Sequence, residues 1–149
     1  MARRIFIVED HAWLRQMLGE YVRNLAGFEV CGAVATAEEA LAALEITPAD
    51  LVVVDVSLPR MDGVELASAI QAQWPALPCL MLSGHGETTH VERALAAGAR
   101  GYVWKGDPSE LGVALQRVLE GETYISEAMR DLLDGGLDKG IGPATSSTT

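Results

Sequence analysis

Short apolar runs that recur along the chain constrain its fold more than any other feature. Five of them are rich in β-forming residues, and they cover Arg3–Glu9, Phe28–Ala35, Leu51–Val56, Pro78–Ser83 and Gly101–Lys105. Stretches such as LVVVDV and PCLML do not alternate apolar with polar residues. Such continuity is typical of strands that are buried on both faces, as in a parallel sheet covered by helices.

Helical patterns fill the intervals between these runs. They are predicted over Ala12–Leu25, from Thr36 onwards, over Val64–Trp74, over Glu87–Ala97, and from Asp107-Pro108 onwards. Thr36 and Glu39 have the spacing of a capping box, and Gly98 suits a helix C-terminus. Asp107 followed by Pro108 suits an N-cap and the first helical position. The alternation of strands and helices predicts an α/β fold with a doubly wound parallel sheet.

Composition and charge exclude several classes of function. The 149 residues suit one domain, and a hydrophobic fraction of 49% is enough for a packed core. The apolar runs are too short for a membrane span or a signal peptide, so we expect a cytoplasmic protein that does not enter a membrane. A net charge of −10 opposes nucleic-acid phosphates, so this chain alone is not expected to bind DNA. Cys31 and Cys79 are isolated, which favours small buried hydrophobes over a disulfide or metal site.

Four of the five predicted strands end in a polar group that can take part in chemistry. The first ends in Glu9-Asp10, the third in Asp55, the fourth in Ser83 and the fifth in Lys105. Taken singly, each has a simpler interpretation, such as a helix cap, a turn residue, a loop hydroxyl or a solvated charge. Because chemistry in doubly wound sheets gathers at the carboxyl ends of the strands, we expect these residues to form one site.

The predicted site has the chemistry of phosphoryl transfer. Glu9, Asp10 and Asp55 would repel one another, and a hard divalent cation such as Mg²⁺ relieves that repulsion. A carboxylate can act as a nucleophile and form an aspartyl phosphate, a reaction that depends mainly on positioning and charge neutralisation. The Lys105 ammonium and the Ser83 hydroxyl would contact the phosphoryl oxygens. Asp55 is therefore the predicted phosphate acceptor.

Four motifs occur in an order and spacing that is similar to a known family. They read IFIVEDH, VVVDVSLPRMDG, MLSGH and GARGYVWK. Over roughly Arg3–Gly121 the chain resembles the receiver (CheY-like) domain of two-component response regulators. The EDH start, GARGYV and GETYIS are most similar to the NarL/FixJ (LuxR-type) class. The resemblance implies a flavodoxin-like sheet of five parallel strands in the order 2-1-3-4-5, with five flanking helices.

The resemblance also implies roles for the metal-binding and phosphate-accepting residues. Asp55 would be the phosphorylation site and would also ligate Mg²⁺. Asp10 would ligate Mg²⁺ directly and Glu9 through water, and the backbone carbonyl of Ser57 would be a further ligand.

A second group of residues would transmit the signal. Lys105 would bind the phosphoryl group, and Ser83 would be the switch hydroxyl. Tyr102 would be the switch aromatic, which turns inward when Ser83 moves toward the phosphoryl group. Ordinary half-buried packing is the simpler interpretation of Tyr102.

The implied partners are a histidine kinase or phosphotransfer protein and an output protein of unknown identity. The fourth helix, fifth strand and fifth helix would form the output surface, with a phosphorylation-dependent homodimer as a further expectation. The domain would be a signalling module rather than an enzyme. One alternative is an interaction module that is independent of phosphorylation. Another, a Mg²⁺-dependent phosphohydrolase, is disfavoured because Ser57 stands where a second acid would be needed.

The predicted organisation is a receiver over residues 1–122, a short C-terminal helix over residues 123–134 and a flexible tail over residues 135–149. Ser126 would cap the short helix, and the tail is rich in Gly, Ser and Thr. A helix-turn-helix domain would need about 60 further residues, and fewer than 30 follow Gly121. The other interpretation is that the chain is the receiver portion of a DNA-binding transcriptional regulator, cut before its helix-turn-helix.

Overall fold

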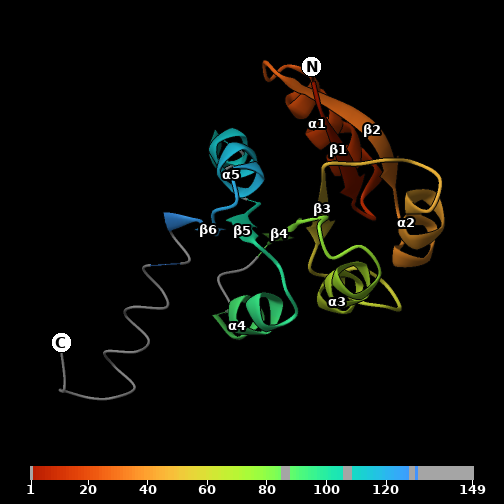
Figure 1. Ribbon diagram of the computed structural model, residues 1–149, viewed down its shortest axis with the longest axis vertical. Helices are drawn as coiled ribbons and strands as arrows, with labels where there is room; N and C mark the ends of the chain where they lie inside the picture. Colours follow the sequence, from red (N-terminus) through yellow and green to blue (C-terminus); the bar gives the residue numbers. More distant parts are fainter. Residues whose placement is uncertain (1, 85–87, 106–108, 128–129, 131–149) are drawn as a thin grey trace.

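A parallel sheet with helices on both faces forms the body of the protein in the computed structural model (Figure 1). The structure describes residues 2–84, 88–105, 109–127 and 130. The strands are β1 (Arg3–Val8), β2 (Phe28–Val34), β3 (Leu51–Asp55), β4 (Cys79–Ser83), β5 (Gly101–Trp104) and β6 (Tyr124–Ile125). The helices are α1 (Ala12–Arg23), α2 (Ala37–Leu44), α3 (Gly63–Gln73), α4 (Thr88–Ala96) and α5 (Ser109–Leu119).

The strand order is β2-β1-β3-β4-β5-β6, which confirms the predicted order of the first five strands. The predicted number of five is wrong, because Tyr124–Ile125 pairs in parallel with β5 and adds a sixth strand. Two residues are too few to show a strand pattern in the sequence. This strand lies inside the segment 123–134, where a helix was expected. Glu127 and Arg130 are helical, and the rest of that helix and the tail lie outside the described residues.

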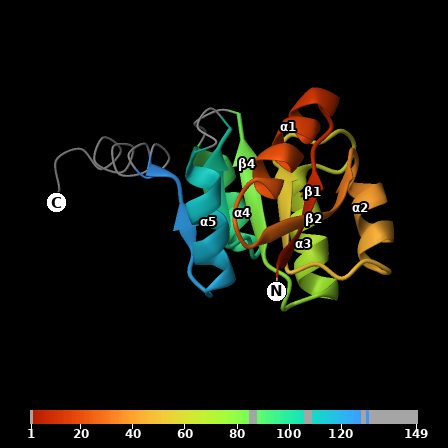
Figure 2. The same ribbon diagram turned by 90° about the horizontal axis from the view of Figure 1, so that it is seen from above.

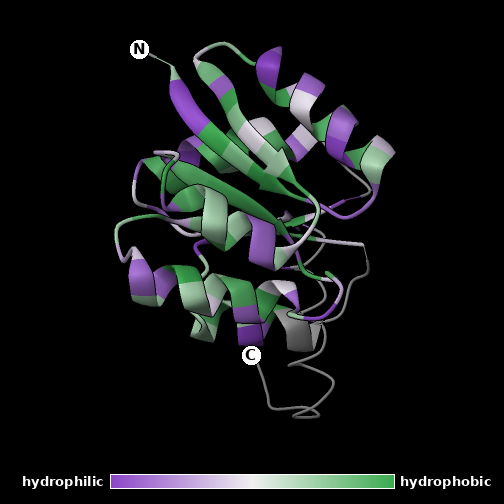
Figure 3. Cartoon of the chain, turned by 90° about the vertical axis from the view of Figure 1, so that its right-hand side faces the viewer, coloured by the Kyte–Doolittle hydropathy of each residue, from purple (hydrophilic) through white to green (hydrophobic). Residues whose placement is uncertain are grey.

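Each face of the sheet has its own apolar core. Helices α1 and α5 cover one face, and α2, α3 and α4 cover the other (Figure 1). Successive residues of β1 and β3 alternate between the two cores, as the pleat of a strand requires. Figure 3 shows hydrophobic residues along the strands and on helix faces that meet them. Of the helices that the structure describes, none has the length and apolar character needed to cross a membrane.

Two of the predicted helix ends are present. The Thr36 hydroxyl accepts a hydrogen bond from the backbone N–H of Glu39 at 3.1 Å, and α2 follows. Gly98 has a φ of +101° just after α4, in the left-handed region that favours glycine. The predicted N-cap of α5, Asp107-Pro108, lies outside the described residues.

Gly63 lets α3 begin directly against the carboxyl end of β3. Its backbone N–H donates to the Val56 carbonyl at 2.9 Å, and Asp62 caps the helix by accepting from the N–H of Glu65. A Cβ atom on Gly63 would overlap the Asp55 carbonyl oxygen and lie 2.8 Å from the Cα atom of Val56. These are backbone atoms, so they could make room for a Cβ atom only if Asp55 moved. Glycine is therefore required at position 63 for close packing.

We therefore predict that Gly63→Ala destabilises the protein by about 1–3 kcal/mol, the usual cost of overpacking. Gly19→Ala is the matched control, because its Cβ would meet only the flexible Arg23 guanidinium at 3.2 Å. Since alanine favours a helix over glycine, the control is expected to gain up to about 1 kcal/mol. Denaturant unfolding measures both free energies, and equal changes in the two variants would refute the packing role of Gly63.

Candidate functional site

The carboxyl ends of four strands meet at one edge of the sheet and carry the predicted residues. Glu9 follows β1, Asp55 ends β3, Ser83 ends β4 and Lys105 follows β5. The strand register keeps these ends level, because Asp55 pairs with Leu82 and Ser83 pairs with Trp104. β3 lies between β1 and β4, so Asp55 has acids on one side and a hydroxyl on the other.

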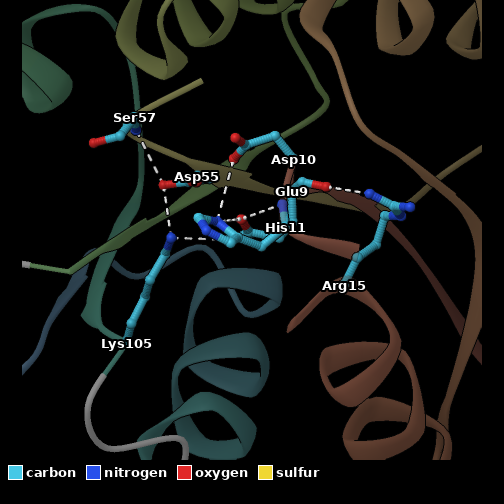
Figure 4. A network of polar contacts seen from close by, with 7 residues as sticks. All are labelled: Glu9, Asp10, His11, Arg15, Asp55, Ser57 and Lys105. Carbon is cyan, nitrogen blue, oxygen red and sulfur yellow. Dashed lines mark hydrogen bonds and ion pairs between the residues drawn. The ribbon is translucent and has the colours of Figure 1, made fainter. Parts of the chain in front are cut away.

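The Lys105 ammonium bridges two buried carboxylates at this edge. Its Nζ lies 3.0 Å from Oδ1 of Asp55 and 3.1 Å from Oε1 of Glu9 (Figure 4). Glu9 is fully buried and Asp55 is 2% exposed, so both carboxylates are largely withdrawn from water. The backbone N–H of Lys105 donates to the Ser83 carbonyl at 2.8 Å, which fixes the start of its side chain. The sequence analysis predicted this meeting of residues, and the structure brings them together.

The electrostatics of the site follow from burial and from these contacts. Burial, and then the charge of Asp55, raise the pKa of Glu9 above its ordinary value. Burial lowers the pKa of Lys105, but the hydrogen bond and charge of Asp55 and the charge of Glu9 outweigh it, so this pKa is raised. Lys105 therefore stays protonated, and burial favours the protonated form of Glu9.

Asp10 and His11 form the exposed rim of the site. Oε2 of Glu9 accepts a hydrogen bond from the backbone N–H of His11 at 3.2 Å. Nδ1 of His11 lies 3.7 Å from Oε2 of Glu9 and 3.9 Å from Oδ1 of Asp10. Each of the three residues offers one ligand atom, and these atoms lie within 4.8 Å of one another. Glu9, Asp10 and His11 could therefore hold a metal ion together.

Asp55 and Glu9 are also held by groups that the sequence analysis did not single out for this purpose. The backbone N–H of Ser57 donates to Oδ1 of Asp55 at 3.0 Å (Figure 4). The Arg15 guanidinium donates to the backbone carbonyl of Glu9 at 2.7 Å. Arg15 lies near the start of α1, and the sequence carried no spacing signal for its contact with a backbone carbonyl.

Ser83 and Tyr102 are both buried on neighbouring strands. Ser83 is 3% exposed, and Tyr102 has no exposed surface. Tyr102 pairs with Met81 in the register and packs in the core on the α4 side. The ring thus occupies the inward position that was predicted for one state of a switch. The roles of these two residues, and that of the Ser57 carbonyl as a ligand, stay predictions.

Comparison with known proteins is consistent with this arrangement. Residues 5–116 match the response regulator receiver domain. The chain is 35% identical over 126 residues to the uncharacterized transcriptional regulatory protein YhcZ of Bacillus subtilis, covering 85% of this chain and 59% of that protein. It is 31% identical over 119 residues to the chemotaxis protein CheY of Thermotoga maritima, covering 79% of this chain and 98% of CheY.

A solved structure shows the same architecture. The two-component response regulator of the LuxR family from Aurantimonas sp. superposes with a TM-score of 0.88 at 30% identity. The match covers 92% of this chain and 99% of that one. Fold, motif order and sequence identity agree, and the chain therefore belongs to the response regulator receiver domain family of signalling proteins.

Proposed function

We propose that this receiver accepts a phosphoryl group on Asp55 from a histidine kinase or a phosphotransfer protein, with Mg²⁺ bound beside it. One observation carries the proposal: the Asp55 carboxylate lies on the central strand with the Lys105 ammonium at 3.0 Å. Acids from β1 lie on one side of it and the Ser83 hydroxyl of β4 on the other. This is the distribution of charge and hydroxyl groups that a transferred phosphoryl group needs.

The reaction is a displacement at phosphorus. An Asp55 carboxylate oxygen forms a bond to phosphorus, the bond from phosphorus to the donor imidazole nitrogen breaks, and the leaving imidazole takes a proton. Lys105, already within ion-pair distance of Asp55, neutralises a phosphoryl oxygen. Ser83 donates its hydroxyl to another. The product is an acyl phosphate on Asp55.

The acid cluster suits a hard divalent cation. Carboxylate oxygens are the ligands that Mg²⁺ prefers, and here the single ammonium of Lys105 is shared between the buried carboxylates of Glu9 and Asp55. Glu9, Asp10 and Asp55, with the Ser57 carbonyl, would hold the ion. When bound, Mg²⁺ supplies positive charge to the transferring phosphoryl oxygens.

The output of this domain is a change at the surface of α4, β5 and α5. Ser83 and Tyr102 link the phosphorylation site to that surface, because they lie on β4 and β5 with their side chains buried. Phosphorylation would shift the population between two arrangements of this surface, which binds an output protein or a second copy of the chain.

A second candidate is the receiver portion of a DNA-binding regulator. It is favoured by the relative YhcZ, which is named a transcriptional regulatory protein and of which the chain covers 59%. The two candidates share the chemistry at Asp55 and differ in what the surface of α4, β5 and α5 controls. An interaction module without phosphorylation has no need of an ion-paired Asp55, Lys105 and Glu9.

Asp55→Asn is expected to abolish phosphorylation by acetyl phosphate, because an amide oxygen is too weak a nucleophile to attack phosphorus. Asp50→Asn is the matched control, since Asp50 lies just before the opposite end of β3, where its carboxylate accepts a hydrogen bond from the backbone N–H of Arg4 at 2.7 Å. Intact-protein mass spectrometry should show the phosphoryl adduct in the wild type and the control only when Mg²⁺ is present. An undiminished adduct in Asp55→Asn would rule out the proposed acceptor.

Glu9→Gln is expected to stabilise the metal-free protein more at pH 7 than at pH 4. The pKa of Glu9 is raised in the folded state, so its contribution to stability is fully present below about 4.5 and is lost as pH rises through the raised pKa. Glutamine removes this loss, so the variant should be more stable than the wild type at neutral pH. With Mg²⁺ present, the wild type should be more stable than Glu9→Gln, because the metal binds the folded wild type and stabilises it.

Denaturant unfolding at both pH values, with and without Mg²⁺, measures these differences. Glu92→Gln, on the exposed surface of α4, makes the same chemical change away from the site. A loss of stability in Glu9→Gln that is equal at pH 4 and pH 7 would contradict the electrostatic account.

A further inference from the structure

The sixth strand takes no part in the phosphoryl chemistry, yet it is attached to the backbone of Tyr102. Ile125 pairs with Tyr102 in the parallel register. The backbone N–H of Ser126 donates to the Tyr102 carbonyl at 2.8 Å, and that of Tyr124 donates to the Arg100 carbonyl at 2.9 Å. Figure 2 shows β6 at the edge of the sheet, beside α5. The chain thus covers the edge of its own β5.

Glu110 of α5 anchors this strand from the side. Its Oε2 accepts a hydrogen bond from the Tyr124 hydroxyl at 3.1 Å and from the backbone N–H of Glu127 at 3.2 Å. One carboxylate oxygen therefore ties both ends of the segment 124–127 to the helix. These contacts are local to α5 and β6 and are independent of the acid cluster.

The Ile125 side chain lies beside the Tyr102 ring. Residues paired across neighbouring strands place their side chains on the same face of the sheet. Ile125 packs against the core that contains Tyr102, and the ring has no exposed surface. Ile125 therefore covers this core on the side where β5 would otherwise be an open edge.

The attachment of β6 to β5 is short, because β6 has two residues. Among the described residues, the buried Ser126 hydroxyl has no hydrogen-bond partner, and burying such a group costs free energy. A short strand that carries such a cost can open and close in response to small changes at its neighbours.

We propose that β6 is an intramolecular latch that holds Tyr102 in its buried position, so that closing of the latch and phosphorylation of Asp55 favour each other. The proposal rests on the proposed function, in which the inward ring accompanies the phosphorylated state. Thermodynamic coupling is reciprocal: if phosphorylation favours the inward ring, it also favours pairing of β6 with β5. The C-terminal segment would then report the phosphorylation state directly.

Amide hydrogen exchange followed by NMR tests the latch on the full chain. Phosphorylation with acetyl phosphate and Mg²⁺ should slow exchange of the Tyr124 and Ser126 amides by on the order of tenfold, within the usual range of coupled sites. Ile125→Ala in the unphosphorylated protein should speed exchange of both amides and shift the ring resonances of Tyr102. Ile46→Ala is the control, because Ile46 is 85% exposed and far from β6 in the sequence; it should change neither.

Tyr124→Phe removes only the hydroxyl that donates to Glu110. Its control is Tyr21→Phe, since Tyr21 and Tyr124 are both partly buried tyrosines that pack against the core on the α1 and α5 side of the sheet. Only Tyr124→Phe should speed the exchange of Ser126.

Two results would overturn the latch: equal Ser126 exchange before and after phosphorylation, or unchanged Tyr102 resonances in Ile125→Ala. The mass of each sample reports whether Asp55 carries the phosphoryl group. If no phosphoryl adduct forms, the proposed function fails. The Tyr102 resonances of unphosphorylated Ile125→Ala and wild type then show by themselves whether β6 holds the ring.

Discussion

The ion pairs of Lys105 with Asp55 and Glu9 are the contacts around which the site is organised. Two carboxylates that are almost completely buried lie at the ends of neighbouring strands, and the ammonium lies within 3.1 Å of both. A buried charge is tolerated only when it is paired, and here two carboxylates share one ammonium. One cation does not balance two buried acids and the exposed Asp10. The remaining imbalance supports the proposal that the site binds a divalent cation.

The topology of the sheet supplies the geometry that these charges need. Because the strands are parallel and their ends are level, residues from β1, β3, β4 and β5 meet without long loops. Gly63 brings the start of α3 against Asp55, and Arg15 holds the carbonyl of Glu9 from α1. Ser83 and Tyr102 lie on β4 and β5, the two strands between Asp55 and β6, so the proposed signal would cross the sheet through these strands.

Most of this architecture could be predicted from the sequence, for physical reasons that differ between elements. Strands buried on both faces leave continuous apolar runs, and Thr36 and Gly98 mark helix ends by capping rules. The acids, Ser83 and Lys105 were found because each follows such a run. β6 was missed because two residues carry no periodicity, and its stability comes from β5 and from Glu110. The sharing of Lys105 between two carboxylates, and the contact of Arg15 with a backbone carbonyl, depend on three-dimensional placement that spacing does not encode.

The Mg²⁺ affinity of Lys105→Met measures whether the Lys105 ammonium competes with the divalent cation that we propose for this site. The amide resonance of Ser57, which donates to Asp55, can follow the titration. Without the competing ammonium, the carboxylates should bind Mg²⁺ on the order of tenfold more tightly than in the wild type. Arg117→Met, which changes the charge equally on an exposed part of α5, should bind as the wild type does. An affinity in Lys105→Met that is equal to or weaker than that of the wild type would contradict the account.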